Sequence, residues 1–186
     1  ASQHVPEEYC EALKGDPVER REAGEQLERQ IAALQAATQR PGRCEALFTD
    51  AEINGWLAEI LPKKFSGTLP KSLSEPRVAI RPDKVMAFVR YHKGDFSSVI
   101  TLTVQPYIPE PNVLALRFHG IRAGAVPWRL DEIVRGTTEA ARQHNVEIEW
   151  RVADGEDPVA RIPIIGLDQC KLDDGKLYLS GTIQDR

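Results

Sequence analysis

The chain has 186 residues, a hydrophobic fraction of 41% and a formal net charge of −4. Its length suits one good-sized domain, or one domain with an appendage. The negative balance and the lack of a Lys/Arg cluster in the sequence argue against nucleic-acid binding and against a patch for anionic membranes. No apolar run approaches the roughly 18 residues of a membrane-spanning helix.

The start of the chain points to upstream processing. Residues 1–8 lack the basic start and the apolar stretch of a signal peptide. Position 1 is Ala rather than an initiator Met. We therefore expect a trimmed or processed product, from which a signal or an anchor has been removed.

The three cysteines, Cys10, Cys44 and Cys170, are widely spaced. The sequence contains no CxxC pair and no Cys–His spacing, so we expect no structural zinc site. Cys10 and Cys44 would meet in a disulfide if the N-terminal helices formed a hairpin. We favour the alternative, in which the cysteines are buried free thiols.

Residues 1–46 are predicted to be a helical extension, because they are rich in Glu, Arg, Gln and Ala. A short helix over 6–14 precedes a longer one over 17–39, which Asp16 caps. The longer helix has one narrow apolar stripe, which fits a helix docked on its own domain, as we favour, or a helix that binds a partner. The stripe consists of Leu27, Ile31 and Leu34.

The strongest helix signal lies at residues 49–61. Thr49 and Glu52 form a capping box, and Pro62 ends the helix. An irregular loop is expected over 63–75, which contains Gly, Pro and several Ser and Lys residues. The apolar face of the helix consists of Ile53, Trp56, Leu57, Ile60 and Leu61.

Four strands are predicted next, over 76–83, 84–93, 95–108 and 112–123. Their connections are short turns, so neighbouring strands should be antiparallel. Strict alternation in the third and fourth strands predicts one face toward a core and one toward water. The second strand is apolar on both faces, so we expect it to be covered on both sides. Its two sets are Val85, Ala87 and Val89, and Met86 and Phe88.

A helix over 126–144 follows, and then three strands over 146–152, 159–164 and 176–183. In the first of these strands Val146, Ile148, Trp150 and Val152 alternate with charged residues. This order predicts an α+β fold, a curved antiparallel β-meander packed on a long helix, with additional N-terminal helices. We expect the helical extension to span 1–46 and the sheet-and-helix domain to span 47–186.

The sequence contains no set of residues typical of catalysis. His4, His92, His119 and His144 are far apart, and no GxSxG, P-loop or GxGxxG motif is present. The acidic clusters at 154–157 and 173–174 coincide with predicted turns, which favour Asp for backbone reasons. We therefore predict that the protein is not an enzyme and holds no metal or cofactor.

The apolar surface between sheet and helices is the remaining candidate for function. Each methylene that such a slot removes from water contributes about 0.8 kcal/mol. Alternation alone does not distinguish a lined slot from a filled core. The predicted lining consists of Trp56, Leu57, Phe88, Leu102, Val104, Leu114, Leu116, Phe118 and Ile133.

Two short motifs carry a resemblance to a known family. Glu52-Ile53-Asn54 opens the capped helix, and Gly124-Ala125-Val126-Pro127 leads into the helix after the meander. Together with the order of elements over about 47–183, they resemble the YpmS-like envelope proteins and, more broadly, the TULIP-like lipid-binding domains. The resemblance implies a tubular sheet wrapped on a helix, a groove for acyl chains, and anchoring outside the cytoplasm.

We therefore predict a non-enzymatic extracytoplasmic protein, periplasmic or envelope-anchored, that binds a lipid or another apolar ligand between sheet and helices. Membrane proximity would come from the removed N-terminal anchor. The alternative is a structural or protein-interaction domain with a solid core, which contacts a protein partner through residues 1–46. Neither hypothesis involves nucleic acid.

Overall fold

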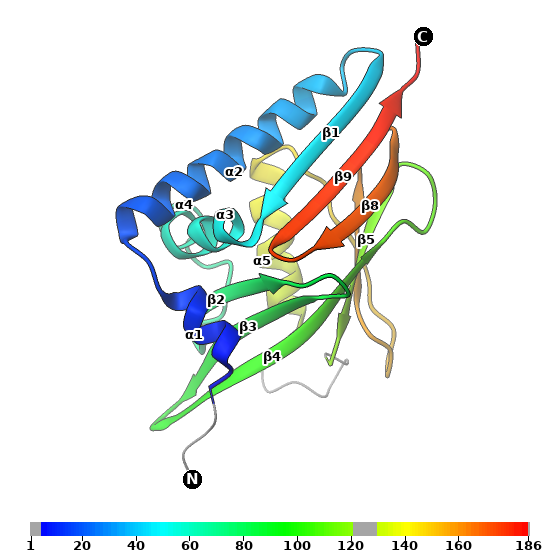
Figure 1. Cartoon of the computed structure of the whole chain (residues 1–186). Coiled ribbons are helices and arrows are strands. Elements are labelled where there is room, and N and C mark those ends of the chain that lie inside the picture. Colours follow the sequence, from blue (N-terminus) through cyan, green and yellow to red (C-terminus); the bar gives the residue numbers. More distant parts are fainter. Residues whose placement is uncertain (1–4, 121–129, 186) are drawn as a thin grey trace.

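The computed structural model describes residues 5–120 and 130–185 of the chain. These residues form helices and strands in the order seen in Figure 1. The elements are α1 (Glu7–Leu13), α2 (Pro17–Ala37), β1 (Gly42–Thr49), α3 (Asp50–Gly55), the π-helix η1 (Trp56–Ile60), α4 (Leu61–Lys64), β2 (Leu73–Ile80), β3 (Val85–Lys93), β4 (Phe96–Tyr107), β5 (Val113–His119), α5 (Leu130–Gln143), β6 (Glu149–Arg151), β7 (Val159–Pro163), β8 (Leu167–Asp173) and β9 (Lys176–Ile183).

The described strands form two antiparallel sheets. The larger sheet has the strand order β2-β3-β4-β5-β7-β6, and the smaller has the order β1-β9-β8. The predicted α+β class is confirmed, and β2 to β5 form the predicted meander. Of the predicted helix over 126–144, residues 130–143 are helical, and 126–129 lie outside the described residues.

Both faces of the six-stranded sheet are covered at strand β3. On one side Ile133 of α5 packs near Val89 and Ile100, and we call this side the α5 face. On the other, the α1 face, Tyr9 packs against Phe88 and its neighbours. Figure 1 shows α1 in front of the sheet and α5 behind it. The prediction that both faces of this strand are covered is therefore confirmed.

Two strands were not predicted. Residues 42–49 form β1, which pairs with β9, although their composition suggested the end of a helical region. Residues 167–173 form β8, which pairs with the other side of β9. The described residues after α5 therefore form four strands rather than three. The predicted boundary between 46 and 47 falls inside β1.

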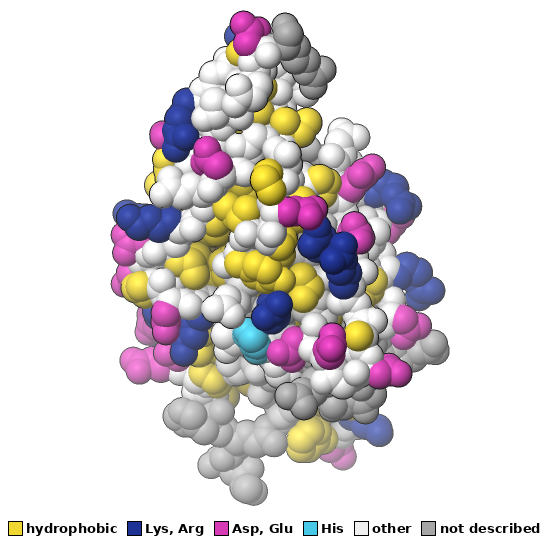
Figure 2. Space-filling model, turned by 90° about the vertical axis from the view of Figure 1, so that its right-hand side faces the viewer, with side chains coloured by type: hydrophobic (Ala, Val, Ile, Leu, Met, Phe, Trp, Pro, Cys, Tyr) yellow, Lys and Arg dark blue, Asp and Glu magenta, His cyan; other side chains and the backbone are white. Residues whose placement is uncertain are grey.

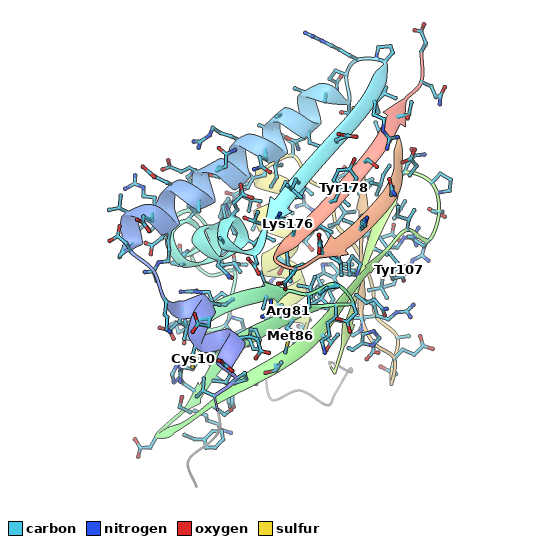
Figure 3. The ribbon with its side chains drawn as sticks, viewed as in Figure 1. Cys10, Arg81, Met86, Tyr107, Lys176 and Tyr178 are labelled. Atoms are coloured by element: carbon cyan, nitrogen blue, oxygen red, sulfur yellow. The ribbon has the colours of Figure 1, made fainter. Side chains whose placement is uncertain are left out.

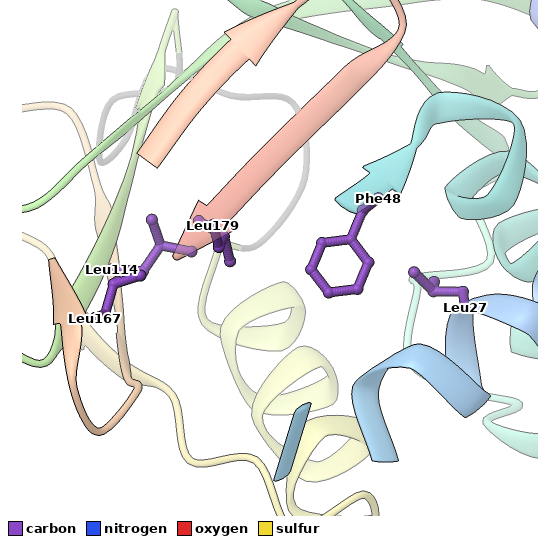
Figure 4. Packing of buried hydrophobic residues seen from close by; sticks show 5 residues of the cluster. All are labelled: Leu27, Phe48, Leu114, Leu167 and Leu179. Atoms are coloured by element: carbon purple, nitrogen blue, oxygen red, sulfur yellow. The ribbon is translucent and has the colours of Figure 1, made fainter. Parts of the chain in front are cut away.

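One large core cluster joins both ends of the chain. It brings together side chains from α2, β1, β5, β8 and β9, as Figure 4 shows. Helix α2 contributes Leu27 to this core, and its residues Ile31 and Leu34 pack against the cluster. The helix is therefore docked on its own domain, as we favoured from its narrow apolar stripe. The buried members of the cluster are Leu27, Phe48, Leu114, Leu167 and Leu179.

Helix α2 crosses the α3–η1 segment at two glycines. A Cβ built on Gly55 would lie 2.1 Å from the carbonyl oxygen of Arg20, and one on Gly24 would lie 2.7 Å from the amide nitrogen of Trp56. Backbones approach this closely only where neither residue has a side chain. The predicted capping box at the start of α3 is present, with Glu52 accepting from the Thr49 amide at 2.8 Å.

Polar side chains of α3 form hydrogen bonds with the backbone of β2, one of the two edge strands of the larger sheet. The Asn54 amide group donates to the Val78 carbonyl at 2.9 Å, and its oxygen accepts from the Val78 amide at 2.7 Å. Asp50 accepts from the Ile80 amide at 3.2 Å. The Ile80 carbonyl accepts from the Gly175 amide at 2.9 Å, which links the two sheets. The exposed backbone of an edge strand would otherwise invite pairing with another chain.

The cysteines are free thiols, so a disulfide between Cys10 and Cys44 is not formed. Cys44 is buried and Cys170 is half-buried, whereas Cys10 is exposed, contrary to the expectation of a buried thiol. Among residues 5–120 and 130–185, no helix has the length and apolar character needed to cross a membrane.

Candidate functional site

The α5 face carries an inward-facing apolar strip that is not fully buried. The cross-strand pairs Val104–Phe118, Leu116–Ala160 and Trp150–Ala160 place β4, β5 and β6 side chains on this same face. The Phe118 and Trp150 rings stack with centroids 5.5 Å apart. We define the α5 strip as Leu102, Leu116, Phe118 and Trp150, all of which remain half-buried.

The predicted lining residues separate into groups. Leu102, Val104, Leu114, Leu116 and Phe118 share the α5 face, as the alternation predicted. The structure places Phe88 on the α1 face, where it is 2% exposed and stacks on Tyr9. Phe88 therefore cannot line the same slot, because adjacent residues of a strand point to opposite faces.

The other predicted residues belong to packed clusters. Trp56 and Leu57 lie against Leu61, Phe65 and Ala140, which closes the layer at the C-terminal half of α5. Ile133 packs with Val89 and Ile100 toward the other end of this helix. Leu114 and Val104 are buried, at 5% and 7% exposure. These parts of the layer are filled, and Leu116 of the strip packs against the large core cluster. None of the four described clusters includes Leu102, Phe118 or Trp150.

Trp150 is a site residue that the prediction from sequence omitted. Its indole Nε1 is buried and has no hydrogen-bond partner. A buried donor without an acceptor costs about 1–3 kcal/mol. The alternation of residues 146–152 already placed Trp150 on an apolar face, and that signal identifies it as a neighbour of the other strip residues.

A hollow of about 450 Å³ lies beside α5 and residues 146–149, and no residue of the α5 strip lines it. Thr138 of α5, together with Val146 and Ile148, forms part of its wall, and Arg142 and Arg161 are among its charged residues. Two further hollows, of about 350 and 420 Å³, lie elsewhere on the described surface. None of these three hollows is lined by a residue of the predicted set.

Both imidazole nitrogens of His119 are engaged on the α1 face. Nδ1 lies 3.0 Å from Asp157, and Nε2 lies 3.0 Å from the Gln105 side chain. This arrangement fixes the ring between two strands and a loop, and leaves neither nitrogen open toward a substrate. Within the described part of the chain, no three His, Cys, Asp or Glu side chains are grouped to hold a metal ion.

The fold and the strip define an α+β protein of two antiparallel sheets with an apolar layer under α5. No protein-family model, curated protein sequence or solved structure matches this chain. The resemblance to YpmS-like and TULIP-like proteins therefore stays a prediction. Of its two motifs, Glu52-Ile53-Asn54 lies within α3, and residues 124–127 lie outside the described residues.

Proposed function

We propose that the protein is a non-enzymatic carrier or sensor that binds a lipid or another apolar ligand between the six-stranded sheet and α5. The observation that carries this proposal is the α5 strip, whose large apolar side chains face inward yet stay half-buried. A packed interior fills such space with side chains. The strip therefore presents apolar surface that a ligand would remove from water.

The energetic gain suits a fatty chain. Each methylene placed against the strip contributes about 0.8 kcal/mol, so a few methylenes already give a measurable affinity. The unpaired indole N–H of Trp150 would donate to an acceptor in the ligand's polar group. The hollow lined by Thr138, Ile148 and Arg161 would receive the rest of a head group.

The proposal is tested with a variant that fills the strip. Leu102→Trp places an indole on the α5 face of β4, whereas Thr101→Trp places the same side chain at an exposed position on the other face. We expect wild-type protein and Thr101→Trp to bind a fluorescent fatty acid and to copurify with extractable lipid. Leu102→Trp should lose at least tenfold in affinity while keeping its far-UV circular dichroism.

The same experiment has a clear contrary result. Lipid-free protein that fails to bind fatty acids, acylglycerols and phospholipids would refute the proposal. Equal binding by Leu102→Trp and wild type would show that any apolar ligand lies elsewhere.

A further inference from the structure

Helix α1 is held to the sheet mainly by one aromatic side chain. Tyr9 is 0% exposed, and its ring stacks on Phe88 with centroids 5.4 Å apart. The phenol donates a hydrogen bond of 2.7 Å to the carbonyl oxygen of Glu75. Val5 and Leu13, one helical repeat to either side, are half-buried against the same cluster.

A buried guanidinium without a direct ion pair to the described carboxylates lies beneath this helix. Arg77 is directly opposite Phe88 across β2 and β3 and is 6% exposed. Its Nη1 donates to the adjacent Pro76 carbonyl, and its Nε has no acceptor. Among the described residues, no carboxylate forms an ion pair with this guanidinium. The Glu75 and Glu59 carboxylates favour the charged form of Arg77 from longer range, whereas burial and Arg20 oppose it and lower its pKa. A buried charge is stabilised best by direct pairing and hydrogen bonds, and the Arg77 guanidinium has no carboxylate of the described residues in direct contact.

A second arginine completes the surroundings of the Tyr9 ring. The Arg90 guanidinium lies 5.9 Å from the ring centroid and pairs with the half-exposed Glu75 carboxylate at 3.3 Å. Burial raises the pKa of Tyr9 and Glu75 raises it further, whereas Arg90 and Arg77 act to lower it. The net shift of the Tyr9 pKa is upward, so the phenol stays neutral although two guanidinium groups act on it.

The backbone that receives the Tyr9 hydroxyl is strained. Glu75 has a φ of 51°, which residues with a side chain rarely adopt, and the β2–β3 register shifts between Ser74 and Arg77. Strain of this kind persists where the surroundings impose it and is frequent at binding sites. The bulge turns the Glu75 carbonyl toward the ring position.

We propose that the surface beneath α1 is a binding site for an aromatic ligand that carries a negative charge, and that Tyr9 occupies it as an intramolecular substitute. Tyr9 supplies the ring that packs on Phe88 but brings only a neutral hydroxyl to the arginines. An aryl phosphate or aryl carboxylate would supply the same ring together with an anion that pairs directly with Arg77. A charge-assisted contact to guanidinium is about twice as strong as a neutral hydrogen bond.

Helix α1 is suited to leave this site. It has seven residues, too few for a stable isolated helix. It joins α2 through Gly15, which has a φ of 119°. Cys10 is exposed on the same helix. Figure 3 shows Cys10 at α1 and Met86 on β3. A dye on Cys10 would therefore report release of α1 without touching the site.

The experiment uses the full chain labelled at Cys10 with an environment-sensitive dye. Phenyl phosphate is titrated, with phenol as the ring without charge and inorganic phosphate as the charge without ring. We expect phenyl phosphate to bind at least tenfold more tightly than either control and to change the dye signal. Binding of phenyl phosphate should also speed tryptic cleavage after Lys14, because Lys14 directly follows α1 and becomes accessible when this helix is released.

Arg77→Met keeps most of the side-chain volume and should abolish the preference for phenyl phosphate over phenol. Arg117→Met, at an exposed arginine of β5, is the matched control and should retain it. If Arg77→Met does not fold, Tyr9→Phe decides the question. It removes the hydrogen bond to Glu75 and should tighten phenyl phosphate binding several-fold.

Three results would overturn the proposal: equal binding of phenol and phenyl phosphate, an unchanged preference in folded Arg77→Met, or unchanged affinity in Tyr9→Phe. A phosphotyrosine peptide identifies the natural source. Tighter binding of the peptide than of phenyl phosphate assigns the ring to a protein segment, and equal binding assigns it to a free aromatic acid.

Discussion

Asn54 is the residue that replaces a missing neighbour strand at the edge of β2. Its side chain is 8% exposed and makes both a donor and an acceptor contact to the Val78 backbone. A backbone amide and carbonyl that lose such partners while buried each cost about 1–3 kcal/mol. The asparagine is therefore a structural part of the sheet although it belongs to a helix.

We expect Asn54→Ala to lower the free energy of unfolding by about 2–4 kcal/mol, because it leaves two backbone groups of Val78 unpaired. Chemical denaturation of both proteins measures the difference. Gln39→Ala, at an exposed position, should stay within about 0.5 kcal/mol of wild type. A comparable small effect of Asn54→Ala would show that water replaces the side chain at this edge.

The cysteines differ in reactivity because their environments differ. Burial raises the pKa of Cys170 from 9.0 to about 11, whereas Cys10 is exposed. The thiolate is the reactive form, so at pH 8 Cys10 should react with a thiol reagent well before Cys170. Mass spectrometry of partly labelled protein identifies the modified residue, and denatured protein serves as the control in which the difference disappears.

The same shift makes a prediction for stability. The folded state holds the Cys170 proton more tightly than the unfolded state, whose thiol ionises near pH 9.0. This tighter proton binding contributes to the free energy of unfolding. The contribution is fully present below pH 9 and is lost as the pH rises toward about 11. Cys170→Ala should show a smaller fall in the free energy of unfolding over this window, as measured by urea denaturation. An identical pH dependence in both proteins would contradict the assignment.

At the level of elements, the crossing of α2 over α3–η1 depends on the absence of side chains at Gly24 and Gly55. Adding a methyl group at position 55 would place it 2.1 Å from the Arg20 oxygen, so the two segments must separate. We expect Gly55→Ala to cost about 3 kcal/mol in thermal or chemical unfolding. Ala33→Ser adds one atom at an exposed position of α2 and should cost less than about 1 kcal/mol.

A double-mutant cycle shows whether the two glycines act as one contact. Once Gly55→Ala has separated the backbones, Gly24→Ala should add little further destabilisation, so the two effects should fall clearly short of their sum. Strict additivity would instead mean that each glycine meets an independent obstacle.

The elements that could be predicted from sequence are those with a local signal. The capping box at Thr49 and the alternation in β4 and β5 depend on residues a few positions apart, and both are present. Strand β1 had no such signal, because Arg43, Glu45 and Ala46 also suit a helix. It is extended because β9, more than 120 residues later, offers a pairing edge.

Strand β8 and the position of Phe88 show two other limits. The register shift between Leu167 and Gln169 interrupts the alternation at the start of β8, so only Cys170 and Leu172 are left as alternating apolar residues, which is a weak signal for a strand. Phe88 was assigned to the slot although its neighbours Ala87 and Val89 point to the α5 face. Because β3 is apolar on both faces, its pattern does not show which of its residues line the slot. The register places Phe88 opposite Arg77 and Thr101, on the face that Tyr9 covers.

At the scale of the whole molecule, elements that only cover a face of a sheet differ from elements that contribute to the large core cluster. Figure 2 shows one face with apolar side chains gathered at its centre and charged ones around them. Covering elements such as α1 contribute one buried side chain. By contrast, α2 and β1 contribute to the cluster that joins both sheets. The two kinds of element should therefore respond differently to removal.

Two truncations test this contrast. A chain of residues 15–186 lacks α1 and should still unfold cooperatively, with an uncovered Phe88. A chain of residues 47–186 also lacks α2 and most of β1, and so loses Leu27 from the core and most of one of the two strands that pair with β9. We expect this second chain to lack a cooperative transition in circular dichroism melting, because each lost large apolar contact weakens the core by about 1.5–3 kcal/mol. A sharp transition close to that of the full chain would instead establish residues 1–46 as an appendage, as their composition alone suggested.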